Sequence, residues 1–163
     1  MAARLRAPMP CPDQDRLLDA FELPARLLQD APALERVTRE LVEDVATEGT
    51  RYAEIRWGPT LHEERGMPLE EGIAAVVDGA AAGSRATGVT IRLIAVAIRT
   101  HEPARAVRMA EIAARFRDRG LTGFDLAGRE ALAPSVVPFL PAFDAARAGG
   151  LGITCHAGEW GGA

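Results

Sequence analysis

Residues 89–98 read VTIRLIAVAI, and this is the stretch that decides the fold. It is rich in β-branched residues and nearly continuous in apolar character, with no regular alternation of polar side chains. A strand with one solvated face alternates polar and apolar residues, whereas a strand of a parallel sheet is buried on both faces. The stretch therefore predicts a central strand of a parallel sheet.

Outward from this strand, the chain alternates between strand-like and helix-like segments. Strands are predicted over 52–57, 123–126 and 151–155, in addition to 89–98. Apolar residues at helical spacing predict helices over 33–48, 69–86, 103–119 and 135–148, with Pro138 and Pro141 confining the regular part of the last helix to its later residues. The strands recur roughly every 30 to 37 residues, and repeated βα units of this length imply a parallel sheet, open or closed into a barrel.

The chain is expected to form one domain over residues 1–163, because this length can bury a real core. Residues 1–20 contain three closely spaced prolines and are expected to be a loose leader.

Unusual polar residues follow the ends of the predicted strands. Arg99 follows 89–98, Asp125 and Gly128 lie at the end of the third strand, and His156 and Glu159 follow the fourth. The carboxyl ends of the strands form the catalytic face of a (β/α)₈ barrel. An open doubly wound sheet usually has a glycine-rich phosphate loop after its first strand, and the sequence contains no such loop. The predicted fold class is therefore α/β, a partial (β/α)₈ TIM-type barrel of about four βα units.

Composition excludes several classes of function. The net charge is −4, and the 19 basic residues are all arginines, scattered along the chain, so no nucleic-acid partner is expected. No apolar run reaches the roughly 18 residues of a membrane helix, and the start of the chain lacks the apolar stretch of a secretory signal. A cytoplasmic location without membrane association is expected. Cys11 and Cys155 form no disulfide framework, and Cys155 is expected to be buried in its strand.

Three sets of polar residues call for an explanation. His156 and Glu159 lie three positions apart; imidazole is a good zinc ligand, and a nearby carboxylate can move protons. Asp125 lies within an apolar strand and needs partners, because burying an unpaired carboxylate is costly. Glu54 and Arg56 lie on the same face of one strand and are expected to form a structural ion pair.

Three segments resemble those of one enzyme family. Residues 155–159 (CHAGE), 123–128 (GFDLAG) and 52–59 (YAEIRWGP) are similar, in the same order, to segments of the adenosine deaminase family of metal-dependent amidohydrolase barrels. The resemblance extends over about residues 17–163.

The resemblance implies a zinc-dependent hydrolase that removes the 6-amino group of a purine nucleoside, giving inosine and ammonia from adenosine. It makes His156 a Zn²⁺ ligand and Glu159 the acid that protonates the purine ring. Gly128 would contact the substrate through its backbone, and Asp125, in the same subsite, would hold that turn. Zinc supplies an activated water, and an acid of this kind works best in a pocket that excludes bulk water.

The family's motifs are incomplete in this sequence. The family has a His-x-His strand with two zinc ligands near its start, and a further histidine and an Asp-Asp pair near its end. The sequence is thus expected to be truncated at both ends and inactive alone. Two alternatives stay open: a deaminase of another aminopurine (adenine, AMP or another nucleoside), and a non-catalytic half-barrel used for binding or assembly. Open sheet edges would favour self-association.

Overall fold

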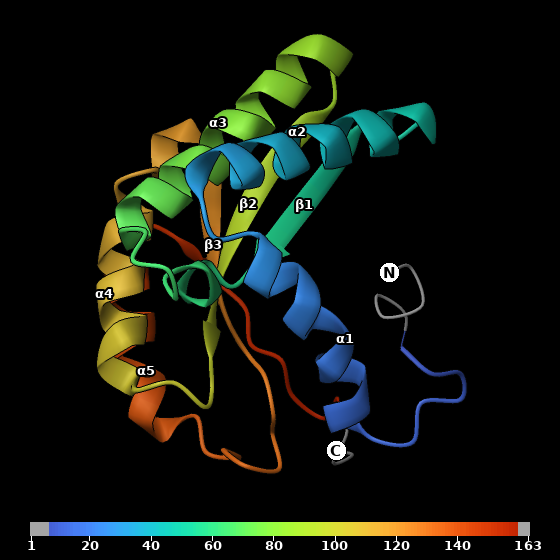
Figure 1. The fold of residues 1–163 in the computed structure, drawn as a ribbon. Helices are drawn as coiled ribbons and strands as arrows, with labels where there is room; N and C mark the ends of the chain where they lie inside the picture. The colour runs from blue at the N-terminus through green and yellow to red at the C-terminus, as the bar shows by residue number, and fades with distance from the viewer. Residues whose placement is uncertain (1–6, 160–163) are drawn as a thin grey trace.

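The sheet has four parallel strands in the order β1-β2-β3-β4 (Figure 1). The structure is a computed structural model and describes residues 7–159. The strands are β1 (Tyr52–Trp57), β2 (Thr90–Ile98), β3 (Leu121–Ala127) and β4 (Gly152–Ile153). Sequential order and uniform parallel pairing confirm the α/β class and the partial barrel.

The central strand is buried as its sequence predicts. From Ile91 to Ala97 every side chain of β2 is buried except that of Arg92. Leu93, Ala95 and Ala97 face the main hydrophobic cluster, whereas Ile94 lies outside that cluster and is nevertheless buried. Both faces of the strand are therefore covered, which is the pattern of a parallel sheet.

The last strand is shorter than predicted, yet its pairing continues beyond its formal end. Residues 152–153 pair with 123–124 of β3, and the backbone N–H groups of Thr154 and His156 then donate to Phe124 (3.0 Å) and Leu126 (2.9 Å). His156 is thereby fixed beside the carboxyl end of β3.

The part of the chain that the structure describes contains five α-helices in addition to the sheet. They are α1 (Gln14–Leu27), α2 (Ala31–Thr47), α3 (Leu69–Thr87), α4 (Pro103–Ala114) and α5 (Leu140–Ala148), with 3₁₀ turns η2 (Pro59–His62), η3 (Arg117–Arg119) and η4 (Val137–Phe139). In Figure 1, α2 to α5 lie toward one side of the strands, and α1 lies apart from them beside the C-terminal segment. Within the segment 135–148, which was expected to be the last helix, regular α-helix begins only at Leu140, as the prolines predict. No helix in residues 7–159 has both the length and the apolar character required to cross a membrane.

Helices α2 and α3 approach closely because two glycines of α3 face α2. A Cβ atom at Gly83 would lie 2.6 Å from Cβ of Val42, and one at Gly79 would fall against the carbonyl oxygen of Glu35. Contacts this short exclude larger side chains at both positions.

The expectation of a loose leader through residue 20 is wrong from Gln14 onward, where α1 begins. Asp13 caps the helix, because its side-chain oxygen accepts a hydrogen bond from the N–H of Arg16 at 2.7 Å. The three prolines precede this cap, so they do not interrupt the first turns of the helix. Residues 1–6 lie outside the described part of the chain.

Candidate functional site

Asp125 is the centre of the polar cluster at the carboxyl ends of the strands. Its side chain is fully buried. One carboxylate oxygen, Oδ2, lies 3.0 Å from Nη1 of Arg56 and 2.8 Å from Nδ1 of His156. The other, Oδ1, accepts a hydrogen bond from the N–H of Leu126 at 2.9 Å. The buried carboxylate therefore has the partners that its apolar surroundings require.

The pairing of Arg56 differs from the sequence expectation. Arg56 reaches across β2 to Asp125 of β3, and Glu54 accepts a hydrogen bond from the hydroxyl of Tyr52 at 2.8 Å. Side chains of alternate strands meet inside a closed or closing barrel, because the sheet curves around them. The expected Glu54–Arg56 ion pair is wrong because this curvature brings a buried carboxylate within reach of Arg56.

The imidazole of His156 is oriented by Asp125. Its Nδ1 faces the carboxylate, so Nε2 is left for another partner. Metal-binding histidines commonly have this arrangement, with a carboxylate fixing the ring from behind. His156 therefore fits one ligand position of a zinc site. Within residues 7–159, however, no group of three or more His, Cys, Asp or Glu side chains is arranged to hold a metal ion.

The other two histidines lie outside this cluster. The ring of His62 lies 2.6 Å from the carbonyl oxygen of Leu28, and that of His101 lies 3.1 Å from the hydroxyl of Thr60. Burial lowers the pKa of both imidazoles. These contacts give both rings structural partners.

Gly128 and Glu159 are brought together by a residue that sequence reasoning missed. Nε2 of Gln14, at the start of α1, lies 3.0 Å from Oε2 of Glu159 and 3.3 Å from the carbonyl oxygen of Gly128. Gln14 is buried, whereas Glu159 is exposed, so the described residues do not enclose the predicted acid. Gly128 has a φ of 113°, which favours glycine at this turn.

The side-chain contacts of Asp125 are with Arg56, His156 and the N–H of Leu126, so its carboxylate supports the imidazole, and its part in holding the Gly128 turn stays a prediction. One expectation for an individual residue needs correction. Cys155 is exposed, because it follows β4 at the outer edge of the described sheet.

A pocket of about 470 Å³ lies next to Gly128. Leu18 and Phe21 of α1 form an apolar wall, and His101 and Arg129 also line it. A volume of this size is in the range of small-molecule sites. Because α1 contributes both this wall and Gln14, a helix whose first residues were expected to belong to a leader forms part of the candidate site.

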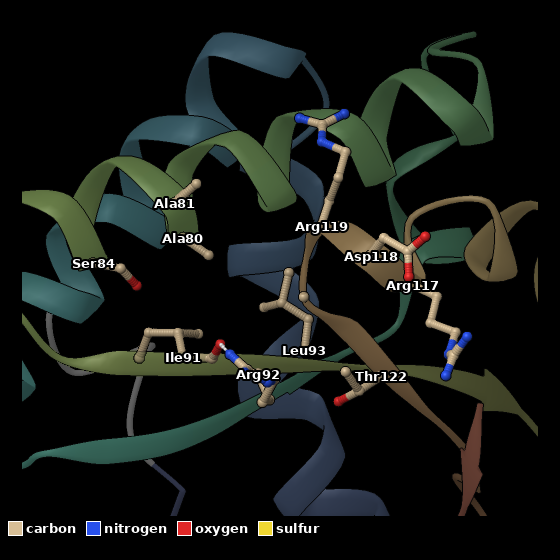
Figure 2. A pocket seen from close by; sticks show the side chains of 11 residues that line it. Ala80, Ala81, Ser84, Ile91, Arg92, Leu93, Arg117, Asp118, Arg119 and Thr122 are labelled. Atoms are coloured by element: carbon tan, nitrogen blue, oxygen red, sulfur yellow. Dashed lines mark hydrogen bonds between the residues drawn. The ribbon is translucent and has the colours of Figure 1, made fainter. Parts of the chain in front are cut away.

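A second pocket, of about 450 Å³, lies at the opposite, amino-terminal ends of β2 and β3. Arg92, Arg117 and Arg119 line it, but Figure 2 shows their guanidinium groups well apart and pointing in different directions. Arg119 forms an ion pair with Asp78. The arginines do not converge on a common point, so this pocket is not assigned as an anion site.

Comparison with known proteins identifies the family of this chain. A family model described as adenosine deaminase matches residues 5–163. This chain belongs to the adenosine deaminase family. An adenosine deaminase of Mycobacterium sp. (strain KMS) is 42% identical over 149 residues, which are 88% of this chain and 40% of that relative. The chain thus spans well under half the length of this curated relative.

Two solved structures share the fold. A zinc-bound amidohydrolase from Burkholderia ambifaria has a TM-score of 0.79 and 32% identity, over 88% of this chain and 40% of that one. Arabidopsis ADAL in complex with IMP has a TM-score of 0.79 and 31% identity, over 90% and 45% of the two chains. Both values support the partial barrel and the family assignment.

Proposed function

We propose that this chain supplies part of the active site of a hydrolytic aminopurine deaminase whose substrate is an adenosine-like nucleoside. The observation that carries the proposal is the double contact of Gln14. Its planar carboxamide bonds the Glu159 carboxylate and the Gly128 carbonyl at once, beside the 470 Å³ pocket. The Glu159 carboxylate and the Gly128 backbone, which are expected to contact a purine, are therefore both within hydrogen-bonding distance of one small planar amide.

In this proposal the purine replaces the Gln14 carboxamide. Glu159 donates a proton to a ring nitrogen, which makes the adjacent carbon that bears the amino group easier to attack. General acid catalysis of this kind typically contributes about 10²- to 10⁴-fold to the rate. The backbone of Gly128 orients the ring, because its position at the end of β3 is fixed by the sheet.

His156 provides one ligand of the proposed zinc ion through Nε2. A catalytic zinc generally has three or more protein ligands, and residues 7–159 do not bring three such side chains together, so at least one further ligand must come from outside them. When bound, zinc supplies a water that is activated for attack. The zinc-bound neighbour supports this choice of metal. We therefore expect the 163-residue chain alone to bind zinc weakly and to be inactive.

The charges around the pocket favour a nucleoside over a nucleotide. Glu22 and Glu64 balance Arg26 and Arg129 among the lining residues. Arg129 also pairs with Asp15, so its charge is already partly neutralised. A phosphate would find no net positive field here. The IMP complex of the Arabidopsis neighbour supports a purine ligand, and its phosphate keeps a nucleotide substrate as the second candidate.

A chimera tests the proposal. Residues 7–159 replace the equivalent segment of the Mycobacterium relative, which restores a full-length polypeptide, and adenosine deamination is followed by absorbance. We expect turnover and bound zinc. Glu159→Gln should lower kcat at least about 100-fold while zinc is retained, because an amide cannot donate as an acid. His156→Ala should lose both metal and turnover.

Controls make the result decisive. Glu54→Gln changes an exposed glutamate of β1 that accepts a hydrogen bond from Tyr52, and it should leave kcat and zinc content unchanged. A folded, zinc-loaded chimera without turnover would contradict the proposal, as would full activity in Glu159→Gln. Deamination by the isolated 163-residue chain above its own His156→Ala variant would contradict the expectation that it is inactive alone.

A further inference from the structure

The loop that carries His156 and Glu159 is held by a carboxylate from the neighbouring loop. Oε1 of Glu130 accepts a hydrogen bond from the backbone N–H of Gly158, and Oε2 accepts one from the N–H of Glu159, each at 2.9 Å. The backbone pairing with β3 ends at the N–H of His156. Glu130 therefore takes over as acceptor where the sheet no longer provides one.

Arg99 holds the same loop from its other end. Its Nη2 donates to the carbonyl oxygen of His156 at 2.5 Å and lies 3.9 Å from Oε1 of Glu130, and its Nη1 donates to the carbonyl of Ala133 at 3.3 Å. The Arg99 side chain is 2% exposed. A buried guanidinium with these contacts ties the loop after β4 to the loop after β3.

We propose that Glu130 and Arg99 are positioning residues that fix the 156–159 loop and thereby set the direction of the Glu159 carboxyl group. The inference rests on the proposed role of Glu159. The hydrogen bonds of Glu130 and Arg99 to the 156–159 loop, here called the clamp, can be measured without metal or substrate. Two bonds to consecutive N–H groups constrain the peptide planes on either side of Gly158, and the second of these planes leads directly into Glu159. A misplacement of about 1 Å at a reacting group can cost roughly 100-fold in rate.

The geometry leaves the reactive end of Glu159 unobstructed by the clamp. Glu130 contacts the backbone of Gly158 and Glu159, whereas the Glu159 carboxylate faces the amide of Gln14. The N–H of Glu130 itself donates to Oε1 of Gln14 at 3.2 Å. One glutamate thus positions the loop while its own backbone borders the place proposed for the purine.

The first test uses NMR on the full, metal-free, ¹⁵N- and ¹³C-labelled chain. Scalar couplings across the hydrogen bonds should connect the amide nitrogens of Gly158 and Glu159 to the side-chain carboxyl carbon of Glu130. In Glu130→Gln only one side-chain oxygen remains, so one of the two amides should exchange with solvent roughly tenfold faster. In Glu130→Ala both should do so. Glu111→Gln, an exposed glutamate of α4, is the matched control and should change neither amide.

The second test separates positioning from general stability. In the active chimera, Glu130→Gln should lower kcat roughly tenfold with KM and zinc content little changed, because only the alignment of the acid is disturbed. Unchanged kcat would overturn the positioning role. Missing couplings in the wild-type chain, or equal exchange of both amides in wild type and variants, would overturn the clamp. The couplings in the wild-type chain test the clamp even if a variant fails to fold. They can be measured whether or not the protein has deaminase activity.

Discussion

Asp125 shows how a single buried carboxylate organises this site. One oxygen contacts two partners, Arg56 of β1 and His156 of the segment after β4, and the other accepts a hydrogen bond from the N–H of Leu126. The sequence indicated that Asp125 needed partners, because its neighbours are apolar. It did not indicate which ones, since Arg56 becomes a partner only when the sheet curves across β2.

Replacing Asp125 by asparagine should lower the free energy of unfolding by about 1–3 kcal/mol. The amide keeps one acceptor oxygen but turns an N–H₂ group toward donors, and at least one buried bond is lost. Arg56 is 43% exposed and can be solvated, which limits the loss. Urea denaturation measures the change. Glu54→Gln is the control: if Glu54 were the true partner of Arg56, this variant and not Asp125→Asn would be destabilised.

The lowered pKa of the His62 imidazole predicts that the stability of the fold depends on pH. Burial holds the pKa of its imidazole below the ordinary value of 6.5, so the unfolded chain takes up a proton at a higher pH than the folded chain does. Stability is then fully present above about pH 6.5 and is lost as the pH falls toward the folded-state pKa. His101, whose pKa is lowered mainly by burial, acts in the same direction.

We therefore expect the Tm to fall between about pH 7.5 and pH 5.5 and the fall to be smaller in His62→Gln. Scanning calorimetry at constant ionic strength measures both slopes. Identical slopes in wild type and variant would show that His62 titrates alike in the folded and unfolded chains.

At the scale of elements, packing between α2 and α3 depends on small residues at particular positions. Gly79→Ala should lower the free energy of unfolding by about 1–3 kcal/mol, because the new Cβ meets the backbone of α2, which cannot move aside cheaply. In Gly72→Ala, in the same helix, the new Cβ would meet the flexible end of Met67 at 3.1 Å and make an ordinary contact with Cδ1 of Leu34 at 3.6 Å. This variant should be neutral or slightly stabilising, because alanine favours helix. Equal destabilisation of both variants, measured by denaturant unfolding, would contradict this packing.

Elements with a strong local signal were predictable, and those that depend on distant partners were not. The composition of β2 predicted a buried strand, and Pro138 and Pro141 predicted that the regular part of α5 begins late. α1 was missed because nearby prolines suggested a leader, although Asp13 is a recognisable cap. Gln14 could not have been found, since its role depends on Gly128 and Glu159, more than 100 residues away. For the same reason, Glu130 was missed and Arg99 was left without a role.

For the molecule as a whole, the sheet has two outer strands, β1 and β4, in the described part of the chain. Such edges template pairing with another chain. We expect the 163-residue chain to self-associate as concentration rises, and Ile153→Lys, on β4, to weaken this association. Leu132→Lys, at an exposed loop position, is the control. Sedimentation equilibrium measures the effect, and a monomer at every concentration would contradict it.

The hydrogen bond between Gln14 and Glu159 joins residues 145 positions apart. Contacts this distant in sequence form slowly, since a long segment must first be ordered between them. During synthesis, ribosomes release the first helix long before the residues that receive its amide exist. α1 can therefore reach its final position only after residue 159 has been synthesised, and a chaperone that shields its apolar face until then would raise the yield of correctly docked protein.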